Sequence, residues 1–315
     1  MSKISPGVVS RVPETTPGEI SRRSALKAAL DRLYGEYDRG GALQDPIEKV
    51  RVYADPADRE IAGFIAAGLA FGRVASILAS IDAVLGVMGP SPAAFVRAFE
   101  PARDGGPLAP FVHRWTRGED VVALVCVLQH MLRSSGTLEQ FFLDGDEPAT
   151  ADIAPGLERF CARARAVDLR PLSTRARAGM HRFFAQPSAG SACKKLNLFL
   201  RWMVRRDEVD LGVWTRVSPS RLVVPLDVHV VRVGQCLGLT RHGSPGWRMA
   251  ASITAALREL DPTDPVRYDF ALCHLGMLGF CGFREKQGDS ACPLRGVCRP
   301  RARRRPASHR PSGRR

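Results

Sequence analysis

The sequence has no apolar run that is long enough to cross a membrane. Its apolar stretches around residues 61–72 and 121–128 are well short of the ~18 residues that a transmembrane helix needs. The N-terminal residues 1–18 also lack the apolar core of a secretory signal peptide. We therefore expect no membrane partner and a location in the cytoplasm.

A cytoplasmic location bears on the eight cysteines, because a reducing compartment disfavours disulfide bonds. Three of them lie within apolar helical patterns and are expected to pack as small hydrophobic residues, namely Cys126, Cys161 and Cys236. Three others stand in polar sequence with glycine and proline nearby, where packing explains them less well, namely Cys281, Cys292 and Cys298.

Strand patterns are almost absent. Alternation of polar and apolar residues is confined to the short piece Leu222–Val224, and neither an internal repeat nor a persistent heptad is present. Helical periodicity instead dominates most of the chain, which predicts an all-α fold. The helices expected before residue 185 are Ser24–Tyr37, Asp58–Ala70, Val74–Met88, Ser91–Phe99, Glu119–Arg133, Thr137–Leu143, Ile153–Ala166 and Thr174–Phe184.

Composition divides the chain into three parts. Residues 1–18 are expected to be disordered, residues 19–298 to form one helical domain, and residues 299–315 to form a disordered tail. The tail holds eight arginines and no acid, and removing these charges from the net +14 leaves +6. The helical part is therefore basic as well, which favours a polyanionic partner, although solubility alone would also explain it.

A short turn leads into a basic helix within residues 183–206. The segment GSACKKLN (190–197) contains the turn, and Lys194 and Lys195 stand where the second helix begins. Unpaired N–H groups at a helix start, next to lysines, favour a bound phosphate, but an ordinary surface loop gives the same pattern. The charged residues on the rest of that helix are Arg201, Arg205 and Arg206.

One acidic residue, Asp227, stands between an apolar run and an apolar helix in VVPLDVHVVRV (223–233). The simplest interpretation is a helix N-cap, which stabilises a helix by ~1 kcal/mol. A capping carboxylate can also take part in chemistry, because the helix N-terminus helps keep it ionised.

The turn, the acid and the cysteine-bearing end occur in the same order in the helix-hairpin-helix DNA glycosylases, the endonuclease III-like superfamily, which this chain resembles. The glycosylase pattern G-x-G-x-K-x-x-N matches residues 190–197, except that Ala192 replaces the second glycine, which requires a negative φ there. The resemblance implies a two-lobed helical fold with the hairpin at about 174–206 and a cysteine-bearing loop at 273–298.

The chain resembles more closely a bacterial family whose activity we cannot state. That family carries the motifs S-x-C-K-[KR]-L-N-L-F-L-R-W-M and P-L-D-x-H-V, and the resemblance covers most of residues 20–298.

The resemblance to the glycosylases implies base excision. Their V-D-T/V-H motif corresponds to Leu226–His229, which makes Asp227 the catalytic carboxylate. Such an anion stabilises the positive charge that develops on the sugar as its bond to the base breaks, and it activates water. The target base must first be flipped out of the duplex.

Bifunctional relatives add a lysine that attacks the sugar carbon, and it aligns with Lys194. Lys195 replaces it if the hairpin is shifted by one residue, and a phosphate contact is the alternative role for Lys194. The 33 residues from Lys194 to Asp227 exceed the family's usual link, and we expect the extra Asp207–Trp214 to form a loop with a short helix. The expected DNA contacts are Gly190, Ser191, Ala192, Lys194 and Lys195.

The iron–sulfur members of the superfamily hold a [4Fe–4S] cluster with C-x6-C-x2-C-x5-C. This chain has Cys281-x10-Cys292-x5-Cys298, with Asp289 near the place of the missing cysteine and Cys273 as a candidate fourth ligand. Three outcomes stay open. They are a cluster, a zinc ion held by three cysteines with His274 or Asp289, and a relic that packs without metal.

The sequence thus predicts a nucleoid-associated hydrolase that acts on double-stranded DNA and removes a damaged or mismatched base, with lyase activity if the lysine is a nucleophile. A first alternative is a DNA- or RNA-binding protein that keeps the hairpin and has no catalysis. A second is an iron–sulfur or zinc scaffold. Protein partners are not indicated by any pattern in the chain.

Overall fold

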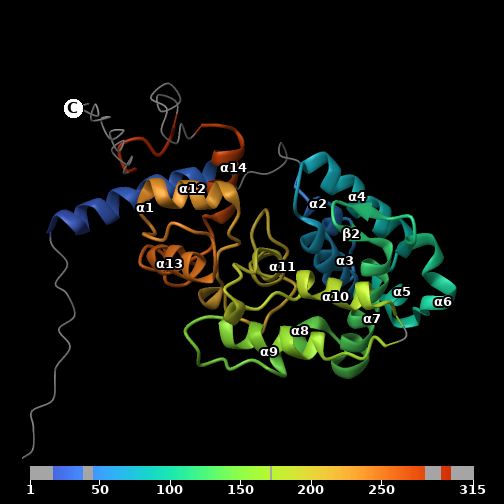
Figure 1. Cartoon of the computed structure of the whole chain (residues 1–315). Helices are drawn as coiled ribbons and strands as arrows, with labels where there is room; N and C mark the ends of the chain where they lie inside the picture. The colour runs from blue at the N-terminus through green and yellow to red at the C-terminus, as the bar shows by residue number, and fades with distance from the viewer. Residues whose placement is uncertain (1–16, 38–44, 171, 281–291, 299–315) are drawn as a thin grey trace, which may run out of the picture.

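The computed structural model of the chain describes residues 17–37, 45–170, 172–280 and 292–298, and helices dominate it (Figure 1). The strands within these ranges are β1 (Val112–His113) and β2 (Thr116–Arg117), which pair antiparallel. The all-α prediction is therefore confirmed. The hairpin was missed because strands of two residues are too short to show an alternating pattern.

One group of helices comes from the N-terminal half and surrounds α3. Nearly all of α3 is buried, and its Glu60 accepts hydrogen bonds from the N–H groups of Leu138 (3.0 Å) and Glu139 (2.9 Å). The group consists of α2 (Glu48–Arg51), α3 (Pro56–Leu69), α4 (Val74–Met88), α5 (Pro92–Ala98), α6 (Pro101–Asp104), η1 (Gly106–Leu108), α7 (Gly118–Ser135), α8 (Leu138–Leu143), α9 (Ala154–Arg165) and α10 (Thr174–Phe183).

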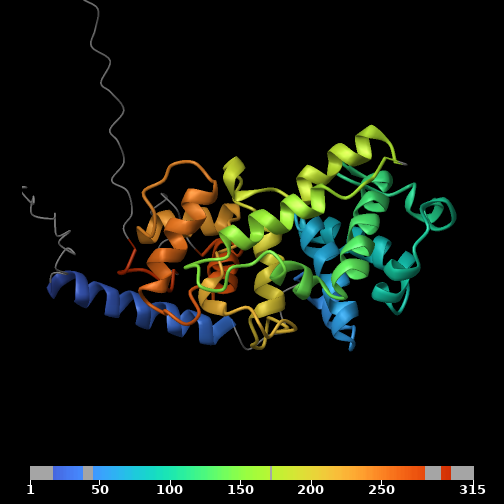
Figure 2. The same cartoon turned by 90° about the horizontal axis from the view of Figure 1, so that it is seen from below.

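A second group joins the two ends of the described chain. It consists of α1 (Pro17–Tyr37), α12 (Val228–Leu237), α13 (Trp247–Arg258) and α14 (Asp269–Met277). Helix α14 packs on both α1 and α12. Figures 1 and 2 show this group and the α3 group on opposite sides of α11 (Lys194–Val204), in keeping with the two lobes expected from the sequence.

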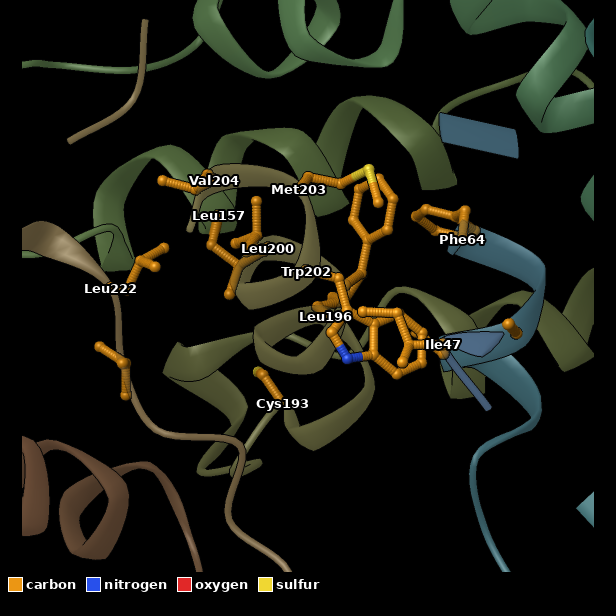
Figure 3. Packing of buried hydrophobic residues seen from close by; sticks show 14 of the residues in the cluster. Ile47, Phe64, Leu157, Cys193, Leu196, Leu200, Trp202, Met203, Val204 and Leu222 are labelled. Carbon is orange, nitrogen blue, oxygen red and sulfur yellow. The ribbon is translucent and has the colours of Figure 1, made fainter. Parts of the chain in front are cut away.

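Helix α11 forms the apolar centre between the groups. Leu196, Leu200, Trp202 and Met203 are buried, and Figure 3 shows Trp202 beside Ile47 of the N-terminal half. Each such side chain contributes roughly 1.5–3 kcal/mol through burial. The helix packs most extensively on α3, so the turn that precedes it is fixed to the α3 group.

Most predicted helix bounds agree with the structure, and α4 agrees at both ends. Helix α1 begins at Pro17, so residues 17 and 18 are helical where disorder was expected, and residues 1–16 and 299–315 lie outside the described residues. The piece Leu222–Val224 is buried and extended but is not part of a strand.

The short helix expected within Asp207–Trp214 is wrong. This segment folds back through a single bridge between Arg206 and Leu211, and Asp207 accepts the N–H groups of Val209 (2.9 Å) and Asp210 (2.7 Å). These side-chain hydrogen bonds to the backbone compete with helix formation. They also turn Asp210 toward α11.

Arg201 of α11 and Arg205, the C-cap of that helix, were expected on its charged surface but are buried instead. Arg201 pairs with Asp210 (Nε–Oδ1 3.1 Å) and with Asp269 of α14 (Nη1–Oδ2 2.6 Å). Arg205 pairs with Asp210 and with Asp264 (Nε–Oδ2 2.9 Å). The buried cluster of Arg201, Arg205, Asp210 and Asp269 therefore joins α11, the 205–214 segment and α14.

Within the ranges that the structure describes, no single helix is long and apolar enough to cross a membrane. Helices α4 and α5 meet that test only when taken together, as a pair bent by 59°.

Replacing Asp210 by Asn should lower the free energy of unfolding by about 3–5 kcal/mol, because two buried guanidinium groups lose their shared counter-charge. Urea denaturation followed by circular dichroism measures the loss. Asp82→Asn is the matched control, since Asp82 forms a surface pair with Lys49 (2.8 Å) that should contribute less than about 1 kcal/mol. Equal losses in the two variants would contradict a stabilising role for the cluster.

Candidate functional site

The turn before α11 contains two residues with left-handed backbone. After η2 (Pro187–Ala189), Gly190 has a φ of 77°, and Cys193, the N-cap of α11, has a φ of 48°. Ala192 is not among the residues with positive φ, so its replacement of a glycine causes no strain. The strain falls on Cys193, at about 1–3 kcal/mol, and the Ser191 hydroxyl accepts its N–H group (3.1 Å).

The start of α11 has no side-chain cap. Cys193, its N-cap residue, makes no capping hydrogen bond to the first N–H groups of the helix. At η2, in contrast, Glu158 already accepts the N–H (3.1 Å) and the hydroxyl (2.7 Å) of Ser188. Asn197 donates to the carbonyl of Ala192 (3.1 Å), which fastens the turn to the helix.

The two lysines at the start of α11 have different surroundings. Lys194 Nζ donates to the carbonyl oxygen of Ala70 (3.3 Å). Lys195 Nζ lies 4.2 Å from the centre of the Phe71 ring and 5.1 Å from that of Phe183. Burial lowers the pKa of Lys195 to about 7, and neighbouring positive charges add to the effect. Much of this amine is therefore unprotonated at neutral pH.

Asp227 is the N-cap of α12, as the sequence predicted. Its Oδ1 accepts the N–H groups of His229 (2.9 Å) and Val230 (2.7 Å). Its Oδ2 accepts a hydrogen bond from the thiol of Cys273 in α14 (3.0 Å). Both oxygens of this half-buried carboxylate are thus held, one by its own helix and the other by a neighbouring helix.

The thiol of Cys273 is buried among charged groups of both signs. Burial raises the pKa of Cys273 well above its usual value, and the charges of Asp227 and Asp269 raise it further, whereas the positive charge of Lys194 acts in the opposite direction. Cys273 contacts Asp227, whereas Lys194 Nζ donates to the carbonyl of Ala70. The sequence predicted Lys194 and Asp227 as a catalytic pair, and among the described residues no hydrogen bond or ion pair joins them. It assigned Cys273 to a metal.

Close packing of α14 on α12 puts Cys273 in place. A Cβ atom on Gly276 would lie 2.6 Å from the Cβ of His229, so a larger residue would push the two helices apart.

Asp269, one turn before Cys273 in α14, has a shifted pKa. Burial raises the pKa of Asp269 to about 6, with the charge of Arg201 opposing and that of Asp227 adding to the shift. Among the described residues, His229 Nδ1 and Asp269 Oδ1 are buried without a hydrogen-bond partner.

An exposed indole lies near the lysines and was not predicted. Trp115, in the turn between β1 and β2, keeps 50% of its surface exposed and stacks on Phe71, with ring centres 4.7 Å apart and planes at 14°. Lys195 also lies over the Phe71 ring, and the exposed Arg114 has a φ of 55° in the same turn. A residue in so short a turn gives no periodic signal. The pair Arg114-Trp115, an aromatic next to an arginine in a polar segment, could nevertheless have indicated a nucleic-acid contact.

The cysteine end is only partly described. Cys281 and Asp289 lie outside the described residues, while Cys292 is buried and Cys298 is half-buried. Within the described ranges, no group of three or more histidine, cysteine or acidic side chains could hold a metal ion. Cys273 donates to Asp227, and His274 Nδ1 lies 2.9 Å from the carbonyl of Phe270. The cluster and the zinc site stay predictions.

Two pockets on the surface lie away from Asp227. One of about 450 Å³ is formed by α9 and α10 around Leu169 and Met180, and another of about 450 Å³ by α7 and α10 around Val122 and Ala176. Neither is lined by Lys194 or Asp227.

Comparison with known proteins identifies the family but not an activity. A family model described as a protein of unknown function, DUF2400, matches residues 45–278, a range that includes the start of α11, Asp227 and Cys273. No curated protein and no solved structure matches the chain. Because the family model covers well over half of its residues, the chain belongs to the DUF2400 family.

Proposed function

We propose that the protein is a DNA base-excision enzyme that cleaves the N-glycosidic bond of a damaged or mismatched base. The observation that carries the proposal is the carboxylate of Asp227. It is fixed at a helix N-terminus by two backbone N–H groups and is only half-buried. Lys194 stands at the start of α11, a helix whose N-cap residue Cys193 makes no side-chain capping hydrogen bond.

The reaction requires a fixed anion. As the bond between the sugar and the base breaks, the base leaves with the bonding electrons and the sugar gains oxocarbenium character. The negative charge of Asp227 stabilises this cation, and the carboxylate can accept a proton from the water that attacks the sugar carbon.

The DNA strand would be held at the start of α11. The N–H groups of the first turn and the ammonium of Lys194 suit a backbone phosphate. The half-exposed Trp115 offers an aromatic face for an unstacked base, and Arg114 adds positive charge beside it. The net charge of +14 would attract a polyanion over longer range.

A lyase step would use Lys194 rather than Lys195. A nucleophile must first lie near the reacting carbon, and only then does its protonation state matter. Lys195 Nζ lies over the rings of Phe71 and Phe183, whereas Lys194 Nζ donates only to the backbone carbonyl of Ala70 and aligns with the lysine of the bifunctional glycosylases. We therefore assign the Schiff base to Lys194 and a supporting role in the aromatic cluster to Lys195.

A second candidate is a nucleic-acid-binding protein without catalysis. It is favoured by Lys194, whose Nζ donates to the carbonyl of Ala70 and makes no hydrogen bond or ion pair with Asp227. The stacked Trp115 and the lysines of α11 would serve such a protein equally well. A [4Fe–4S] cluster held by the cysteine end would be structural in either case.

Asp227→Asn should lower base release by about 10²–10⁴-fold, because the general base and the fixed negative charge are lost. The variant should fold normally, since Asn is as good an N-cap as Asp. A panel of lesion-containing duplexes, incubated with wild type and variant in parallel, measures the effect. Asp55→Asn is the matched control. Asp55 is likewise an N-cap, since it accepts the N–H of Ala57 at the start of α3 (2.7 Å), but it belongs to a different helix from Asp227.

Two results would contradict this assignment. Base release by Asp227→Asn at the wild-type rate would remove Asp227 from the chemistry. DNA binding by the wild type without release of any base in the panel would favour the non-catalytic candidate.

Lys194→Ala should abolish the covalent adduct that borohydride traps on an abasic duplex, because the attacking amine is absent. Lys195→Ala should still give the adduct and serves as the neighbouring-lysine control. The adduct is measured as a shifted band on a denaturing gel. Trapping by Lys194→Ala but not by Lys195→Ala would reverse the assignment, and no trapping by wild type would indicate a glycosylase without lyase activity.

Trp115→Ala should weaken binding to a duplex with an unpaired base by about 1–3 kcal/mol, the usual contribution of one base–aromatic stack. Trp115→Phe should retain most of the affinity. Fluorescence anisotropy titrations at several salt concentrations measure both variants, and the salt dependence should be unchanged because no charge is removed. Unchanged affinity in Trp115→Ala would exclude the indole from the binding surface.

A further inference from the structure

The Oδ2 oxygen of Asp227 has a hydrogen-bond partner, the thiol of Cys273, that has no part in the proposed reaction. Oδ1 is held within α12, but a carboxylate with only one held oxygen can still tilt about its bond to Cβ. The thiol of Cys273, 46 residues along the chain, donates to Oδ2 at 3.0 Å. This is the side-chain hydrogen bond that joins α14 to the candidate catalytic group.

The position of Cys273 is set by several independent contacts of α14. One turn before it, Asp269 is paired with the buried Arg201 (2.6 Å). Three residues after it, Gly276 allows the close approach of α14 to His229. The sulfur of Met277 lies 3.8 Å from the Cys273 sulfur on its exposed side. These contacts fix the backbone of Cys273 beside Asp227. Of the two acceptors that the thiol reaches, the charged Oδ2 of Asp227 (3.0 Å) is nearer than the sulfur of Met277 (3.8 Å).

We infer that Cys273 is a positioning residue for Asp227, whose thiol proton fixes the orientation of the carboxylate for base excision. This inference rests on the proposed function for its catalytic consequence, but the hydrogen bond itself can be tested without any activity. It assigns to Cys273 a role that differs from the metal ligation expected from the sequence.

The thiol is suited to this role because it stays protonated. Burial and the negative charges of Asp227 and Asp269 raise the pKa of Cys273 well above neutral pH. A thiolate in its place would repel Asp227, whereas the protonated thiol donates to it. The other ionisable groups around the pair are Lys194 and Arg201 of α11, His229 of α12, and Asp269 and His274 of α14.

The first experiment measures the hydrogen bond by infrared spectroscopy of the folded full-length chain. The S–H stretch absorbs where other protein groups do not, and the difference between wild type and Cys273→Ser isolates the band of Cys273. In Asp227→Asn the band should move to higher frequency, because a neutral amide accepts a weaker hydrogen bond than a carboxylate. In Asp55→Asn, which changes a distant cap, it should not move.

The second experiment measures the catalytic consequence. Cys273→Ala should lower kcat for base release by about tenfold, the expected effect of losing one hydrogen bond to a charged group, with little change in KM. Cys273→Ser should restore most of kcat, because its hydroxyl can donate to the same oxygen. Cys126→Ala, which removes a half-buried thiol of α7, is the matched control and should leave kcat unchanged.

The outcomes separate this inference from the proposed function. A band that does not respond to Asp227→Asn overturns the positioning role, whatever the activity. A responsive band with equal kcat in wild type and Cys273→Ala also overturns it. A responsive band in a protein that releases no base overturns the proposed function and leaves the pairing of Cys273 with Asp227 established.

Discussion

The ion pairs of Arg201 connect the parts of the molecule on which the candidate site is built. This side chain is buried in α11 and reaches Asp210 in the fold-back segment that follows the helix and Asp269 at the start of α14. A buried charge without partners is very unfavourable, so this arrangement restricts how α14 can be placed against α11. One turn along α14, Cys273 meets Asp227, and the orientation of the candidate catalytic acid thereby depends on a salt bridge that does not touch it.

The same cluster shows how the long connection between the hairpin and Asp227 is folded. After α11 the chain folds back at the bridge between Arg206 and Leu211. This fold-back places Asp210 against Arg205 at the end of α11. The N-terminal N–H groups of α12 then hold Asp227 by strictly local hydrogen bonds. A loop of this kind adds little entropic cost with length.

Features that depend on neighbours in sequence could be predicted, and features that depend on distant neighbours could not. The helix class, the bounds of α4 and the N-cap at Asp227 all follow from residues within one or two turns of each other. Arg201 was placed on a charged surface because its partners, Asp210 and Asp269, lie in a loop and in another helix. Cys273 was assigned to a metal for the same reason, since nothing nearby in sequence indicates that its partner is Asp227.

The lysine that lies over the rings of Phe71 and Phe183 has a thermodynamic consequence. With a pKa of about 7, Lys195 is charged in only part of the molecules at neutral pH. An anion that docks at the start of α11 favours the charged form, so its binding is coupled to the uptake of protons from solvent. The occupancy of this helix end by any anion then varies with acidity near neutral pH, even if the anion itself does not titrate there.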